Sequence, residues 1–308
     1  MSMRTHLSPW LAALALVGLA GGPAAASSRK YPVTRGEDCP YRVSTPHFDV
    51  QFSVSPRIGQ GYGGLCEKAY GKFCTIFQVD EEKDVVWEGK CHVYLFQNRD
   101  EFRDFATNVH KSGTGAMSGG YTRITKQDPD IVLFLHEEDH VKLQQTLIHE
   151  MTHVFLQLFE REVAIPLWIH EGFAQYFEFQ HYAPKSRMKM ARRVIKRMVK
   201  SERYVPLSRF WVARFPPTDL GSYSQAWSLI EFMASSKSSR RKTGDFVRRI
   251  KEKGSPGTEI KSSEDLEKAA MEAQEHLLKL QQDAMEDIFG VDMAQFEALW
   301  KRYVLAKY

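Results

Sequence analysis

The chain has 308 residues, of which 43% are hydrophobic, so it can bury a core in one large domain or two small ones. Its formal net charge of +4 comes from 42 basic and 38 acidic residues. This charge is too small and too evenly mixed to indicate a nucleic-acid-binding protein. Partners must therefore be sought in local sites.

The N-terminus has the pattern of a signal peptide. Arg4 supplies a positive charge, residues 11–20 are apolar, and residues 24–26 are small enough for cleavage. The pattern predicts cleavage near Ala26 and export to the periplasm or the extracellular space. The apolar run is about half of the roughly 20 residues that cross a bilayer, so an uncleaved anchor is the weaker alternative. No later segment is apolar enough, and we expect no transmembrane segment after cleavage.

An exported chain would place its four cysteines in an oxidising compartment, which favours disulfides. The cysteines are Cys39, Cys66, Cys74 and Cys91. We expect Cys66 and Cys74 on one helix, where eight residues span about 12 Å. Disulfide Cα atoms lie no more than about 7 Å apart, so these two cannot pair. We favour one bond between Cys39 and Cys66 and another between Cys74 and Cys91.

The first half of the chain mixes strand and helix patterns. Residues 47–52 alternate as a half-buried strand does, and Asn98 with Glu101 forms a helix-capping signal. A glycine-rich loop is expected over residues 112–120. The predicted strands are residues 47–52, 91–96, 121–124 and 131–135, and the predicted helices are residues 65–77 and 102–109.

From His140 the chain has helical periodicity almost to its end. One apolar stripe runs through residues 143–158, and a break before Pro166 separates it from a second helix that extends through Phe177. Residues 185–203 carry nine Lys and Arg residues beside an apolar stripe, which predicts a basic amphipathic helix. A solvated helix face is the simplest interpretation, and contact with an anionic surface or substrate is the alternative.

The motif H-E-M-T-H at residues 149–153 carries the chemistry. Two histidines four residues apart project from the same face of a helix, so they can bind one zinc ion together. Glu150 lies beside that face, where it can take a proton from a water molecule that the metal activates. The alternative interpretation is a pair of core histidines that are satisfied by hydrogen bonds.

A third ligand is available on the second helix, where His170 and Glu171 are both chemically competent. Adjacent helical positions diverge by about 100°, so periodicity alone does not choose between them. The small residues Gly172 and Ala174 favour Glu171, because they adjoin it and clear a surface on which the two helices can approach.

At these residues the sequence resembles the peptidase MA-like group of gluzincin metallopeptidases. The resemblance rests on H-E-M-T-H at 149–153 and on P-L-W-I-H-E-G-F-A-Q-Y-F-E at 166–178, which is similar to the group's W-x-x-E-G-x-A-x-Y pattern. Only these central residues are specific. A weaker likeness extends to Y-S-Q-A-W at 223–227.

The resemblance implies a role for each site residue. His149, His153 and Glu171 would be the ligands of one Zn²⁺ ion, and Glu150 would be the general base. Tyr223 is the candidate for stabilising the oxyanion, because tyrosines of the group that follow the third ligand often do so. Packing at a helix start is an equally good interpretation of Tyr223.

The sequence departs from the better-known gluzincins at two places. Gln175 stands where they have an aspartate that orients a ligand histidine, and an amide would raise the basicity of that ligand less. Residues 115–119 read G-A-M-S-G and lack the glutamate with which aminopeptidases hold a free amino group. The second departure favours an endopeptidase.

The predicted architecture is α+β: a small mixed β-sheet packed on a helical zinc-peptidase core, with a helical C-terminal extension. We expect a signal peptide at residues 1–26, a gluzincin-like metallopeptidase domain at 27–234 and the extension at 235–308. The predicted function is hydrolysis of a peptide or protein substrate. The alternative is a catalytically silent, zinc-holding protein of the cell surface that binds an anionic polymer through its basic helix.

Overall fold

The computed structural model describes residues 39–308 apart from residues 82, 113–119, 138, 161–162, 164, 182–184, 217–218 and 255–262. The predicted signal peptide and the G-A-M-S-G segment lie outside the described residues. The chain forms two compact units. The first contains the described residues up to Ala69 together with Trp87–Glu150, and the second contains Tyr70–Val86 and Met151–Tyr308.

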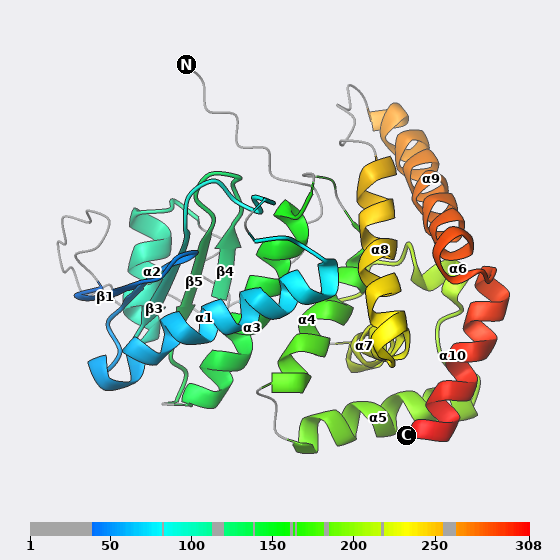
Figure 1. The fold of residues 1–308 in the computed structure, drawn as a ribbon, viewed down its shortest axis with the longest axis horizontal. Coiled ribbons are helices and arrows are strands. Elements are labelled where there is room, and N and C mark those ends of the chain that lie inside the picture. Colours follow the sequence, from blue (N-terminus) through cyan, green and yellow to red (C-terminus); the bar gives the residue numbers. More distant parts are fainter. Residues whose placement is uncertain are drawn as a thin grey trace. The chain divides into compact units, whose positions relative to one another are not determined.

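The first unit is built on a five-stranded mixed sheet with the strand order β1-β2-β3-β5-β4 (Figure 1). The pairs β2–β3 and β3–β5 are parallel, whereas the two edge strands pair antiparallel with their neighbours. The strands are β1 (Tyr41–Ser44), β2 (Phe48–Phe52), β3 (Cys91–Phe96), β4 (Gly120–Arg123) and β5 (Asp130–Phe134). With the helices that follow, this sheet confirms the predicted α+β class. The short strand β1 was not predicted.

Helices cover both faces of the sheet. Helix α1 (Pro56–Phe77) approaches one face so closely that a side chain on Gly59 would overlap the ring of Phe52. Helix α2 (Arg99–Asn108) packs on the other face, and the predicted cap is confirmed because the side chain of Asn98 accepts two backbone hydrogen bonds. All five residues of β2 are buried, so the prediction of a half-buried strand was wrong. Because helices cover both faces of the sheet, an inner strand such as β2 is covered on both sides.

The predicted disulfides are absent, although all four cysteines lie among the described residues. Cys66, Cys74 and Cys91 are buried free thiols, and Cys39 is also buried. Cys39 belongs to the apolar cluster on the α2 face, whereas Cys66 lies near Cys91, where burial raises the pKa of the Cys91 thiol. Cys39 and Cys66 therefore lie on opposite faces of the sheet. Cys74 lies eight residues after Cys66 on α1, about 12 Å along the helix axis, and is not bonded to Cys91.

The second unit is helical and has one shared core. Trp168 lies at its centre, fully buried, with its ring stacked on Trp211 at 5.8 Å. The indole nitrogen of Trp168 donates a hydrogen bond to Gln281 at 2.7 Å, and that of Trp300 donates to Ser228 at 3.0 Å. The C-terminal helices are thus part of the core that holds α4.

The helices of the second unit follow one another with short connections. They are α4 (Leu167–His181), α5 (Lys185–Lys200), α6 (Leu207–Phe210), α7 (Leu220–Met233), α8 (Lys237–Lys253), α9 (Ser263–Phe289) and α10 (Met293–Lys307), together with the last turns of α1 and of α3 (His140–Leu158). Within the part of the chain that the structure describes, no helix combines the length and the apolar character needed to span a membrane.

Gly244 lets α8 pack directly against the end of α1. A methyl group at Gly244 would overlap the backbone carbonyl oxygen of Ile76, which cannot move aside as a flexible side chain could. Gly64, in the middle of α1, has open space around the position of a Cβ atom. The two helical glycines therefore differ in what a side chain would meet.

We predict opposite effects of alanine at these two glycines. Gly244→Ala should lower the free energy of unfolding by about 1–3 kcal/mol, because the helices must separate to admit the methyl group. Gly64→Ala should raise it by up to about 1 kcal/mol, because alanine is the better helix former. Chemical denaturation of the two variants measures both changes, and a neutral Gly244→Ala would contradict the close approach.

Candidate metal centre

The H-E-M-T-H motif lies in the middle of α3, as its periodicity predicted. The helix runs from His140 to Leu158, and its apolar stripe is buried. His153 is only 6% exposed, while His149 and Glu150 are partly exposed. One side of the motif is therefore held in the protein interior, and the other remains accessible.

Helix α4 brings a buried carboxylate to the two histidines. Glu171 has no exposed surface, and its Oε1 atom lies 3.7 Å from Nε2 of His153. One ligand atom from each of His149, His153 and Glu171 can be chosen so that all three lie within 4.8 Å of one another. Among the described residues, no other cluster of histidine, cysteine and carboxylate side chains has this metal-binding geometry.

The donor set suits a zinc ion. Two imidazoles and one carboxylate form a ligand set of catalytic zinc sites, in which a fourth position stays open. Ligand atoms about 2.0–2.1 Å from a tetrahedral zinc ion lie about 3.3 Å apart. The ligand atoms here lie within 4.8 Å of one another, and the Nε2 atom of His153 and the Oε1 atom of Glu171 are 3.7 Å apart. The three residues thus have the geometry of an HExxH…E metal site.

Glu150 follows His149 directly and is placed beside this group. Burial raises the pKa of its carboxyl group, and the neighbouring imidazole of His149 acts in the opposite direction. A carboxylate in this setting is a stronger base than one in water. The arrangement therefore puts a potential proton acceptor next to a potential metal ion.

The structure distinguishes the two adjacent candidates on α4. Glu171 joins the group with His149 and His153, whereas the ring of His170 lies 5.5 Å from that of His153, centroid to centroid. Burial, with a smaller contribution from the charge of Lys251, lowers the pKa of His170 to about 3. His170 therefore lies beside the group of His149, His153 and Glu171 without being part of it.

Gly172 has a different neighbour from the one predicted. We expected its missing side chain to let α4 approach the helix of the two histidines. A Cβ atom at Gly172 would instead lie 2.7 Å from the carbonyl oxygen of Ala226 on α7. Because adjacent helical residues diverge by about 100°, Gly172 can face α7 while Glu171 faces α3.

Lys251 is a site-supporting residue that the sequence analysis missed. It lies on α8 without exposed surface, and its Nζ atom donates hydrogen bonds to the carbonyl oxygens of Leu156 at 2.6 Å and Gln157 at 2.9 Å. These carbonyl groups belong to the last turn of α3, which has no further helical donors. A cation there also complements the helix dipole. The surrounding basic residues of α8 gave no sequence signal that would single it out.

Tyr223 and Gln175 are the two remaining residues that the sequence analysis singled out. Tyr223 lies in the first turn of α7, where its ring meets Phe215 edge-on at 5.3 Å. The cap of that helix is Asp219, which accepts a hydrogen bond from the backbone of Ser222. Gln175 is 9% exposed on α4, one turn after Glu171. Neither residue is part of the three-residue group.

One family model matches a segment of the chain that contains the metal centre. Residues 144–255 match the family described as "Protein of unknown function (DUF1570)". The matched segment is similar to that family from the H-E-M-T-H helix to the end of α8, and it includes Lys251. No curated protein matches the chain.

We predict that Lys251→Met destabilises the protein by about 1–3 kcal/mol, because two buried carbonyl groups lose their donor. Lys253→Met, two residues further along α8 at an exposed position, is the matched control and should change stability by no more than about 0.5 kcal/mol. Thermal and urea unfolding of both variants test this difference. Equal stabilities would show that Lys251 does not support α3.

Proposed function

We propose that the protein is an exported zinc-dependent peptidase of the gluzincin type. The observation that carries this proposal is the convergence of His149, His153 and Glu171 with Glu150 beside them. A structural site would be closed by a fourth protein ligand, whereas this group offers three ligands and a partly exposed side. An accessible three-ligand site with an adjacent carboxylate favours catalysis.

In this proposal His149, His153 and Glu171 would hold a zinc ion, and Glu150 would transfer the proton. A bound zinc ion would lower the pKa of water toward about 7 and polarise a carbonyl group. Glu150 accepts a proton from water on a carboxylate oxygen while the water oxygen forms a bond to the carbonyl carbon of the peptide. Glu150 then delivers that proton to the nitrogen of the departing amine as the bond between this nitrogen and the carbonyl carbon breaks. The raised pKa of Glu150 suits both the uptake and the delivery of that proton.

We propose an endopeptidase rather than an aminopeptidase, because residues 115–119 lack the glutamate with which aminopeptidases hold a free amino group. Tyr223 is proposed to donate a hydrogen bond to the oxygen of the tetrahedral carbon. Tyr223 follows Glu171 in the sequence, and its side chain is partly exposed on α7.

Glu150→Gln is expected to abolish most hydrolysis while the protein keeps its zinc, because the amide has the shape of the carboxylate but cannot accept the proton. Turnover should fall by at least about a hundredfold. A digest of a peptide library with wild type and variant, each analysed for metal content, measures both quantities. Normal turnover in the zinc-loaded variant would refute the assigned base.

The third ligand can be tested with one substitution at two adjacent positions. Glu171→Gln should lower zinc affinity by about tenfold or more, because the charged ligand is lost. His170→Gln should leave nearly stoichiometric zinc and substantial hydrolysis. Metal content after dialysis against a weak chelator decides between the two positions, and the reverse ranking would make His170 the ligand.

A further inference from the structure

The apolar side of the basic helix α5 packs against other helices of the protein. Ala191, Ile195 and Val199 are buried, and the helix packs against α7 and α10. Its apolar stripe is therefore not available for insertion into a lipid surface. What α5 presents outward is its charged side, together with the exposed side chain of Met190.

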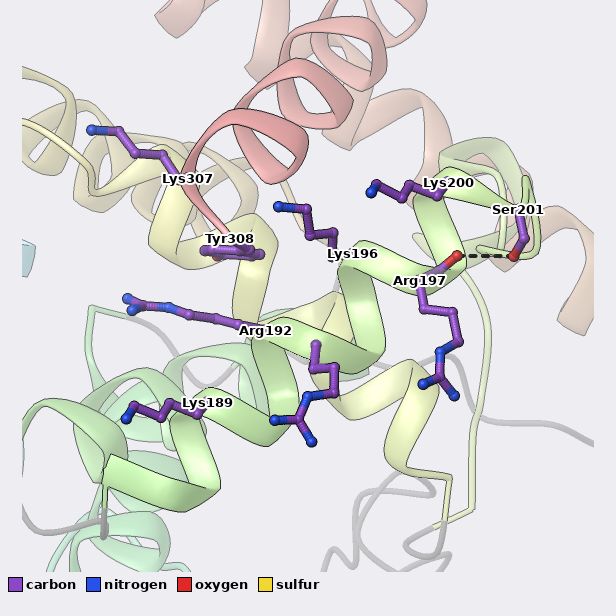
Figure 2. A pocket seen from close by; sticks show the side chains of 9 residues that line it. Lys189, Arg192, Lys196, Arg197, Lys200, Ser201, Lys307 and Tyr308 are labelled. Carbon is purple, nitrogen blue, oxygen red and sulfur yellow. Dashed lines mark hydrogen bonds between the residues drawn. The ribbon is translucent and has the colours of Figure 1, made fainter.

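That charged side forms one wall of an open hollow of about 660 Å³ (Figure 2). Figure 2 shows Lys196 and Lys200 on α5 and Lys307 at the end of α10 around it. Ser201 and Tyr308 complete the polar lining, and no acidic residue is among the described residues that line it. We call this the basic pocket. Its cations are Lys189, Arg192, Arg193, Lys196, Arg197, Lys200 and Lys307.

One of these cations is already compensated. Arg192 pairs with Glu231 at 2.9 Å, and the hydroxyl group of Tyr308 donates to the same carboxylate. None of the other six forms an ion pair with an acidic residue in the described part of the chain. Glu231 thus fixes one side of the pocket, while most of its positive charge remains uncompensated.

The uncompensated charges follow a regular spacing. Lys189, Arg193, Lys196 and Lys200 recur at intervals of four, three and four residues, which places about one cation on each turn of the same helix side. The row from Lys189 to Lys200 extends over about 16 Å. Such a row matches an extended chain that carries negative groups at repeated intervals better than it matches a single small anion.

We propose that the basic pocket binds an acidic polysaccharide, whose carboxylate or sulfate groups lie along an extended chain. Arginine and lysine together suit these groups, since guanidinium binds them through paired hydrogen bonds and ammonium through its charge. The inference does not depend on the peptidase activity. It uses residues outside the metal centre.

Two other polyanions fit the pocket less well. Single-stranded nucleic acid is held by aromatic side chains on which bases stack. The one aromatic ring of the lining, Tyr308, is stacked on Trp227 at 5.6 Å and also contacts the guanidinium of Arg192, with the two groups 5.3 Å apart. A protein that binds an anionic membrane through a helix presents a flat basic surface with apolar side chains that insert into the lipid. Here the apolar stripe of α5 is buried and the basic surface forms a pocket.

The test is titration of the full chain with heparin and polygalacturonate, with neutral dextran as the uncharged control. Both acidic polymers should bind, with affinity that falls as sodium chloride is raised. The double variant Lys196→Glu with Lys200→Glu should weaken binding by about tenfold or more, because it removes two cations and adds two repelling charges.

The matched control is Lys237→Glu with Arg241→Glu on α8. It has the same spacing and the same change of charge at exposed positions outside the pocket. It should keep the wild-type affinity within about twofold, and thermal unfolding of both double variants shows that each is folded. An equal loss in the control, or no binding of the acidic polymers, would overturn the proposal. Tighter binding of phosphatidylserine vesicles or duplex DNA at the same salt concentration would also overturn it.

Discussion

The structure depends on a buried carboxylate next to two histidines. Glu171 has no exposed surface, and a charged group in that position is strongly destabilising unless something nearby compensates it. Its Oε1 atom lies 3.7 Å from His153, so an imidazolium or a metal ion between the side chains can supply the compensation. The need to neutralise Glu171 thus links the stability of the α3–α4 pair to its proposed chemistry.

The surrounding helices hold that pair in place from several sides. Gly172 brings α4 against α7, and Lys251 fixes the last turn of α3 from α8. Gln281 on α9 reaches Trp168 at the start of α4 through a buried hydrogen bond. Each of these contacts involves the backbone of a helix or a residue near its end. None of them occupies the space between the side chains of His153 and Glu171.

Much of this arrangement could be predicted from local patterns. The spacing of His149 and His153 on an apolar-periodic helix predicted their shared face, and the capping signal at Asn98 predicted the start of α2. The choice of Glu171 over His170 rested on the neighbouring small residues and on the family resemblance, because neighbouring helical positions are ambiguous in periodicity. Lys251 could not be found, since its partners are backbone carbonyl groups almost a hundred residues earlier.

The predictions of the disulfide bonds and of the neighbour of Gly172 were wrong. Both depended on which elements lie side by side in the fold, and local sequence patterns do not show this. The cysteine pairing rested on predicted export and on the spacing of Cys66 and Cys74 along one helix, and neither reveals that Cys39 and Cys66 lie on opposite faces of the sheet. Gly172 was assigned to the wrong helix for a similar reason. A glycine in a helix indicates that another element packs closely there, but it does not identify that element.

The hydrogen bond between Trp168 and Gln281 makes the centre dependent on distant parts of the chain. The segment that matches the family ends at residue 255, yet Gln281 lies beyond it on α9. The indole nitrogen at the start of α4 would otherwise be buried without an acceptor. A substitution on α9 can therefore destabilise the start of the helix that carries Glu171, although Gln281 and Trp168 are 113 positions apart in the chain.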